Sequence, residues 1–349
     1  MRRRDLLSGL SLVPLAVPAV AQCVVPTFPA TNTPGTCFDP GIAPSLDLSF
    51  LTGVLDPSFT FSRASIATDG RYTDATGSSY TTFQSGAPRM LANGLLIEQA
   101  STNLLLNSDA PATQTTASLA TGTYVLWVIG SGTATAAAGT ATGSGFGAAS
   151  AGTPRVFTIS VAGTVSVTVT GSLTRFQLEA NTFPTTYIPT AGATITRARD
   201  AATAPIAVAA GSVLSLSADF MLPGLSATAN QFAVTIDDGA NTNRVALYRV
   251  GSTTELRSTN AAAGQIVAGT LVTAGTVAKL AVRWSAAIYT AAAQGQTPVA
   301  GGSTAVPAMT TLRLGDSQPG TGTLNGWLQR VRFWRRLLSP TEMQEITAP

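Results

Sequence analysis

Short runs of alternating apolar and polar residues recur along the chain and predict β-strands with one buried face. In the run 157–161, Phe157, Ile159 and Val161 alternate with threonine and serine, and a similar run covers 165–170. Only Ala162 and Gly163 separate these two runs, so the pattern predicts a hairpin. Further alternating runs cover 214–220, 232–237 and 280–284.

Only the C-terminus carries a clear helix signal. Ser339 can cap a helix, Pro340 suits its first position, and Glu342 completes a capping box. The run before this helix predicts a strand, with one face formed by Trp327, Val331 and Phe333 and the other by Leu328, Arg330, Arg332 and Trp334.

Many short strands with glycine-rich turns and little helical periodicity indicate an all-β protein of antiparallel sandwiches or jelly rolls. At about 150 residues per domain, 349 residues suggest two such domains. Pro189, Gly192 and Pro205 interrupt the strand pattern between two regions with many predicted strands. We therefore expect one sandwich over 46–190 and a jelly roll over 191–349, joined by a short linker.

The N-terminus has the pattern of a secretory signal peptide over 1–21. A basic segment precedes an apolar stretch, small residues stand before the cleavage point, and Arg3-Arg4 resembles a twin-arginine signal. We therefore expect export to the periplasm, cell surface or medium. The Pro- and Thr-rich segment 22–45 reads as a linker, and its Cys23 and Cys37 could form a disulfide in that oxidising setting; free thiols or lipidation of Cys23 are the alternatives.

Composition excludes several kinds of chemistry. The chain has no histidine, which excludes Ser-His-Asp and Cys-His catalysis and histidine-based zinc sites. Loss of the first 21 residues lowers the formal charge from +3 to +1, too little for a nucleic-acid partner. No 18-residue apolar run follows the N-terminus, so no membrane span is expected.

Three groups of segments resemble phage and prophage tail proteins. The first comprises 59–65 (FTFSRAS), 94–98 (GLLIE) and 102–106 (TNLLL). The second, similar to the closing edge of the carbohydrate-binding-like sandwich in those proteins, comprises 176–179 (FQLE), 185–190 (TTYIPT) and 196–200 (TRARD). The third, 326–334 (GWLQRVRFW) leading into Leu338-Ser339-Pro340, looks like the end of a laminin-G-like, concanavalin A-like jelly roll.

This resemblance implies a non-catalytic attachment protein that binds a cell-surface polysaccharide or glycoprotein, as tail spikes do. Multivalency favours a homo-oligomer or a phage-like particle for such proteins. Tail proteins normally carry no export signal, so the N-terminus departs from the family and leaves open a role in the host envelope. The alternative from another class is a structural particle or envelope component that makes protein contacts.

The most polar stretch is the loop 237–243. Asp237, Asp238, Asn241 and Asn243 offer side-chain oxygens for sugar hydroxyls, and Asp237 and Asn241 for Ca²⁺. Asp316 could join them if the two loops share an edge of the sandwich. The structural alternative is a hairpin loop, because turns require these same residue types. No other cofactor is expected.

Aromatic and buried charged residues give further candidates. Trp284 and Trp327 alternate in phase with aliphatics and read as core, whereas Trp334 reads as more open and able to stack on a pyranose ring. Arg63, Glu98 and Asn103 lie in the segments that resemble tail proteins, where charges inside apolar runs indicate a buried structural network.

A polysaccharide hydrolase is the third alternative. Glycosidases need two carboxylates that face each other across a cleft. Asp237 and Asp238 are neighbours, which point to opposite faces of a strand, and the other acids follow no motif. We therefore expect no enzyme activity and no catalytic residue.

Overall fold

The computed structural model describes residues 43–74, 79–226, 229–251, 255–260, 264–269, 272–318 and 322–349. In this part of the chain all strand pairings are antiparallel, and a short helix near the C-terminus is the only helix. The all-β prediction is therefore confirmed. The expected signal peptide, most of the linker, Cys23 and Cys37 lie outside the described residues.

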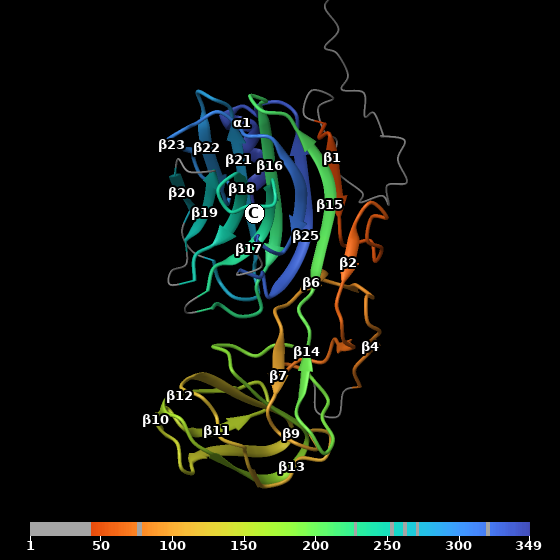
Figure 1. Cartoon of the computed structure of the whole chain (residues 1–349), viewed down its shortest axis with the longest axis vertical. Coiled ribbons are helices and arrows are strands. Elements are labelled where there is room, and N and C mark those ends of the chain that lie inside the picture. The colour runs from red at the N-terminus through yellow and green to blue at the C-terminus, as the bar shows by residue number, and fades with distance from the viewer. Residues whose placement is uncertain are drawn as a thin grey trace, which may run out of the picture. The chain divides into compact units, whose positions relative to one another are not determined.

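Two large sheets pack face to face (Figure 1). The first has the order β23-β22-β21-β16-β25-β6-β5, and β1 also pairs with β25. Its strands are β1 (Leu46–Ser49), β5 (Arg89–Leu91), β6 (Gly94–Ile97), β16 (Leu214–Met221), β21 (Val277–Trp284), β22 (Tyr289–Ala293), β23 (Val299–Gly301) and β25 (Gly326–Trp334).

The second large sheet has the order β2-β15-β24-β17-β18-β19-β20. Its strands are β2 (Thr60–Ser62), β15 (Ala201–Val208), β17 (Gln231–Asp237), β18 (Arg244–Arg249), β19 (Leu256–Asn260), β20 (Gly264–Gly269) and β24 (Met309–Leu314). The strands predicted from alternation at 214–220, 232–237 and 280–284 are confirmed as β16, β17 and β21.

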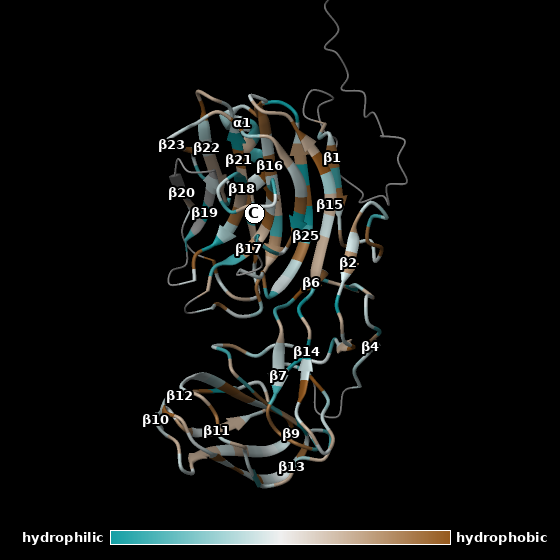
Figure 2. Ribbon diagram, viewed as in Figure 1, coloured by the Kyte–Doolittle hydropathy of each residue, from teal (hydrophilic) through white to brown (hydrophobic). Residues whose placement is uncertain are grey.

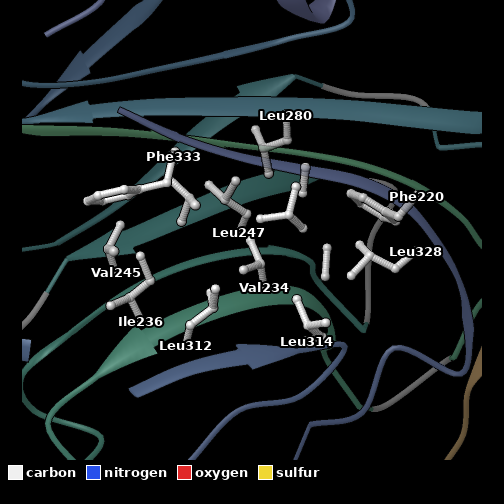
Figure 3. Packing of buried hydrophobic residues seen from close by; sticks show 14 of the residues in the cluster. Phe220, Val234, Ile236, Val245, Leu247, Leu280, Leu312, Leu314, Leu328 and Phe333 are labelled. Atoms are coloured by element: carbon white, nitrogen blue, oxygen red, sulfur yellow. The ribbon is translucent and has the colours of Figure 1, made fainter. Parts of the chain in front are cut away.

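Aliphatic side chains from both sheets interlock in one core. Figure 3 shows Phe220 and Phe333 from the first sheet opposite Val234, Ile236 and other aliphatic side chains of the second. Burial of such side chains provides the main driving force for closing the two sheets on each other.

A smaller, six-stranded sheet has the order β10-β12-β9-β13-β8, with β11 on β9. Its strands are β8 (Gln114–Thr115), β9 (Gly122–Ala138), β10 (Thr142–Ser144), β11 (Gly147–Ser150), β12 (Arg155–Val161) and β13 (Val165–Glu179). The predicted strands are present, but the predicted hairpin is wrong, because β12 and β13 pair with opposite edges of β9. The central strand comes from 122–138, a stretch rich in alanine and threonine that shows little alternation and is mostly pale in the hydropathy colouring of Figure 2.

The two long strands of this sheet contain glycines where the backbones come close. A Cβ on Gly132 would lie 2.1 Å from the carbonyl oxygen of Thr170, and Gly171 adopts a φ of +72°. Side chains from both halves of the long strands share one core, which includes Leu126, Ala136, Val167 and Leu178. Glycine is needed here because a side chain would force β9 and β13 apart.

Strand pairing divides the chain differently from the expected boundary at Thr190. β1, β5 and β6 belong to the first large sheet and β2 to the second, so 46–97 joins the C-terminal half of the chain. The smaller sheet is formed by strands between residues 114 and 179, and β7 (Ser101–Asn103) pairs with β14 (Ile195–Arg197) in a separate two-stranded ribbon. A second ribbon joins β3 (Ala67–Thr68) to β4 (Thr82–Phe83). Alternation within single strands could not reveal pairing over such sequence distances.

The C-terminal helix α1 (Pro340–Thr347) begins as predicted. The Ser339 hydroxyl accepts from the Glu342 backbone, and the Glu342 carboxylate accepts from the Ser339 backbone. Met343 and Ile346 cover the outer side of the first sheet.

The predicted faces of β25 are wrong at their N-terminal end. Where β25 pairs with β16, Asp219 lies opposite Arg330 and the next residue, Phe220, lies opposite Leu328. Gln329 therefore has no partner on β16 and forms a bulge. Because a bulge reverses the alternation, Leu328 joins Val331 and Phe333 in the core, and Trp327 does not.

Candidate functional site

The predicted loop 237–243 follows β17 and satisfies most of its own polar groups. Asp237 is buried and accepts hydrogen bonds from Arg313 Nε at 2.6 Å and Nη2 at 3.2 Å. It also accepts from the backbone of Gly239 at 2.8 Å. The Asp237 carboxylate therefore anchors the base of the turn and is already paired with a cation.

Asp238, Asn241 and Asn243 lie closer to solvent. The Asp238 carboxylate accepts from Asn243 Nδ2 at 2.7 Å and from the Ala240 backbone at 2.9 Å. The hydrogen bond from Asn243 lowers the pKa of Asp238, and Arg244 donates to Asn241 at 2.8 Å. These contacts are those of a self-contained hairpin loop, the structural alternative named above.

The loop that carries Asp316 lies beside this turn. Gln318 Nε2 donates to the Gly239 carbonyl at 2.8 Å, which ties the two loops together. Asp316 itself is 4% exposed and lies 3.2 Å from Arg199. Burial raises the pKa of Asp316 to about 6, although Arg199 acts in the opposite direction.

Trp334 does not lie open to solvent, and that expectation is wrong. Its side chain is 1% exposed and packs with Leu338, Met343 and Ile346. Trp284 and Trp327 are also buried, as predicted. The sequence could not show that α1 folds back over this part of the sheet.

The segments that resemble tail proteins meet in a buried network of charges, which we call the Glu98 network. Its charged members are Arg63, Arg89, Glu98, Arg197 and Asp200, all at most 4% exposed. Glu98 Oε2 accepts from Arg89 at 2.6 Å and from Arg197 at 2.7 Å, and Asp200 Oδ1 accepts from Arg63 at 2.9 Å. Arg89 also pairs with Asp200.

Hydrogen bonds complete this network. Thr186 donates to Glu98 through its backbone at 2.9 Å and its hydroxyl at 2.6 Å. Burial alone would raise the pKa of Glu98, but Arg197, Arg89 and these hydrogen bonds lower it to about 2. Asn103 is fully buried and donates to the Ile188 carbonyl at 2.9 Å. Arg63 and Glu98 belong to one buried network, as predicted, and its paired carboxylates suit a structural role. Asn103 is buried as predicted, but its side chain bonds backbone groups and none of the charged members.

An open cavity of about 340 Å³ lies at the β7–β14 ribbon, and we call it the ribbon cavity. Its walls come from β7, β14, the start of β9 and the segments around 119 and 180. The lining residues are Ala100, Ser101, Thr102, Leu104, Ser118, Leu119, Ala120, Tyr124, Ala180 and Thr196. This volume lies within the roughly 300–1,000 Å³ usual for small-ligand sites.

Hydroxyl groups supply most of the polar side-chain chemistry of the ribbon cavity, and none of its lining residues is charged. The Thr102 and Thr196 hydroxyl oxygens lie 2.7 Å apart, so one donates to the other and one O–H stays available. Ser101 donates to the buried Glu179 at 2.6 Å, and Tyr124 donates to the Ala120 carbonyl at 2.9 Å. Aliphatic side chains such as Leu104 separate these hydroxyls.

Sequence reasoning missed this cavity. Its residues are serine, threonine, alanine and leucine with one tyrosine, Tyr124, and they form no motif. The pairing of β7 with β14, residues about 90 positions apart, brings them together, and no local pattern predicts it.

The described part of the chain contains neither a cluster of metal-ligating side chains nor a membrane-spanning helix. No group of three or more Asp, Glu, Cys or His side chains lies close enough together there to hold a metal ion. The expected Ca²⁺ pair, Asp237 and Asn241, has its carboxylate bound by Arg313 and its amide oxygen by Arg244. No described helix is long and apolar enough to cross a membrane.

No protein-family model and no curated protein sequence matches the chain. Among solved structures, a carbohydrate-binding module of Ruminococcus gnavus IT-sialidase, bound to sialyllactose, is 13% identical, with a TM-score of 0.34 over 41% of this chain and 96% of that one. A SAP-like pentraxin of Limulus polyphemus is 14% identical, with a TM-score of 0.32 over 41% and 72%. Mouse laminin alpha1 domains LG4-5 are 10% identical, with a TM-score of 0.28 over 71% and 92%. All three TM-scores are below 0.5.

Proposed function

We propose that this chain is a non-catalytic attachment protein that binds a neutral glycan in the ribbon cavity. The observation that carries the proposal is the lining of that cavity, which combines hydroxyls with aliphatic side chains and contains no charged residue. Sugar rings present hydroxyl groups at their edges and C–H groups on their faces, so such a wall can satisfy both.

The same lining argues against cleavage of the glycan. Glycoside hydrolysis uses a pair of carboxylates at the bond that breaks, and the ribbon cavity has none in its walls. Glu179, which lies behind Ser101, is fully buried and accepts four other hydrogen bonds, including those from Trp127 and Thr185. The cavity can therefore hold a sugar and lacks the groups to transform it.

The setting we propose is the outside of a cell. The resemblance to phage and prophage tail proteins and the signal-like N-terminus both suit attachment to a surface polysaccharide or glycoprotein, by a tail-like particle or by the exported protein. A homo-oligomer would raise the strength of attachment by multivalency.

A glycan array probed with the purified full chain tests this function. We expect binding to neutral glycans that persists at high salt, because no charge contributes to the site. Ala120→Trp should abolish it by filling the cavity, since Ala120 is an exposed lining residue. Ala137→Trp, an exposed alanine of β9 outside the cavity, is the matched control and should bind normally.

Other outcomes separate the alternatives. Binding that Ala120→Trp leaves intact and that Asp238→Ala/Asn243→Ala removes would move the site to the 237–243 loop. Release of new reducing ends from a bound polysaccharide would show a hydrolase. Failure to bind any glycan, together with self-association or capture of particle proteins, would favour the structural component.

A further inference from the structure

The hydroxyls of Thr102 and Thr196 form a pair in the wall of the ribbon cavity. The two threonines lie directly opposite each other where β7 and β14 pair, and their hydroxyl oxygens are 2.7 Å apart. Side chains alternate along a strand, so Thr102 points away from Ser101 and Asn103, which bond buried groups on the other face of β7. Thr196 is exposed and Thr102 is half-buried, so a ligand in the cavity can reach the pair.

This pair places a hydrogen-bond donor beside a hydrogen-bond acceptor. One threonine donates to the other, which leaves one O–H and lone pairs on both oxygens without a further hydrogen bond to the described part of the chain. Two other hydroxyls of the wall have no O–H to offer. Ser101 already donates to Glu179, and Tyr124 already donates to a backbone carbonyl.

Two hydroxyls on adjacent carbons of a sugar ring can complement this pair. Each hydroxyl donates one hydrogen bond and accepts others, so one can accept from the free threonine O–H while its neighbour donates to the second threonine. The four hydroxyls then form a closed ring of hydrogen bonds, in which each bond polarises the next. A lone hydroxyl meets only one threonine, and hydroxyls on non-adjacent carbons are not held at the required spacing.

We propose that the ribbon cavity recognises a vicinal diol, two free hydroxyls on adjacent ring carbons of the neutral glycan, through the Thr102–Thr196 pair. Aliphatic lining residues such as Leu104 and Leu119 suit the C–H groups beside the diol. This inference rests on the proposed function, and it narrows the ligand from neutral glycans in general to those with an unsubstituted diol.

Linear polymers that differ only in linkage test the inference with the full chain. Internal residues of a (1→4)-linked glucan, galactan or mannan keep free hydroxyls on C2 and C3, whereas those of the (1→3)-linked polymer have none on adjacent ring carbons. Long chains keep the contribution of the end residues small. The (1→4)-linked member of a pair should bind about tenfold more tightly, the effect expected when one or two hydrogen bonds are lost from an open site.

Mild periodate oxidation gives an independent test, because it cleaves the bond between adjacent carbons that both carry free hydroxyls. Each glycan that binds on the array is oxidised, reduced with borohydride and tested again beside a sample treated without periodate. Binding should be lost after oxidation and retained in the untreated sample.

Substitutions in the pair assign the preference to these hydroxyls. Thr196→Val removes one hydroxyl with little change in size and should weaken binding about tenfold, whereas Thr196→Ser keeps the hydroxyl and should stay within about twofold of the unsubstituted chain. Thr102→Val should behave as Thr196→Val does. Thr168→Val is the control, because Thr168 is an exposed threonine of β13 that does not line the cavity.

Three results would each overturn the inference. They are equal binding of both linkages in every pair that binds, binding that survives periodate, and unchanged binding in both valine variants. The proposed function stands in each case if Ala120→Trp still abolishes binding. Failure to bind any glycan overturns the proposed function itself.

Discussion

Glu98 and Asp238 are both carboxylates held by several hydrogen bonds, yet their surroundings differ in every other respect. Glu98 is 4% exposed, and the Arg89, Thr186 and Arg197 side chains that donate to it lie 9, 88 and 99 positions away. Asp238 is exposed, and its partners Ala240 and Asn243 lie two and five positions away. A polar cluster in the sequence therefore marks a turn more readily than a site, and scattered charges can form the more consequential cluster.

The largest effect is expected from Glu98→Gln. The substitution leaves two guanidinium groups short of a counter-charge in a buried setting, so the free energy of unfolding should fall by about 3–5 kcal/mol. Denaturant unfolding measures this change. Asp47→Asn is the control, because Asp47 pairs with Arg330 at a side-chain exposure of 33% and should lose less than about 1 kcal/mol. Similar losses of stability in the two variants would contradict the larger contribution expected of the buried Glu98.

The pH dependence gives an independent check on Glu98. Its pKa is lowered from 4.5 to about 2 in the folded protein, so the ionised carboxylate stabilises the fold above its ordinary pKa. That contribution should disappear as the pH falls from about 4.5 towards 2. Glu98→Gln should make the acid unfolding curve less steep over this window.

Asp237 is the member of the loop that resembles Glu98 most closely. It is fully buried against Arg313, so Asp237→Asn should cost about 2 kcal/mol by leaving the guanidinium poorly paired. A double-mutant cycle with Asp237→Asn, Arg313→Gln and the double variant shows whether the loss of stability comes from the Asp237–Arg313 ion pair. An interaction energy below about 0.5 kcal/mol would contradict that assignment.

Asp316 should show the opposite pH dependence to Glu98. Its raised pKa means that the folded protein holds a proton which the unfolded chain releases, so stability should decrease as the pH rises from about 4 to 6. Asp316→Asn removes the titrating group. The loss in free energy of unfolding between about pH 4 and 6 should then be smaller by on the order of 1 kcal/mol. Thermal unfolding at a series of pH values measures the slope, and an unchanged slope would show that Asp316 stays ionised.

The predictions that succeeded depend on short sequence distances. The strands at 214–220 and 232–237 and the capping box at Ser339 follow from periodicity and from neighbours three positions apart. The division of the sheets failed because β1 and β6 pair with β25, more than 220 residues further along. The predicted faces of β25 are wrong because of a single bulge, which the periodicity of the sequence does not reveal.

The candidate site residues also differ in how far the sequence could predict them. The buried roles of Glu98 and Asn103 were predictable, because a charge or amide inside an apolar run must find partners in the fold. The ribbon cavity was not predictable, since Thr102 and Thr196 resemble dozens of other threonines until β7 and β14 pair. The loop 237–243 attracted attention through composition, and the structure shows that its polar atoms mainly bind one another.

The smallest effect should come from Asp238→Ala. Asp238 is exposed, and its hydrogen bonds to Ala240 and Asn243 can be replaced by water, so the free energy of unfolding should change by less than about 0.5 kcal/mol. Glycan binding should also persist, because Asp238 does not line the ribbon cavity. Titration of the same array ligands against this variant and against Ala120→Trp measures both sites under one set of conditions. A large loss of binding in Asp238→Ala, with the fold intact, would show that an exposed turn rather than the uncharged cavity holds the sugar.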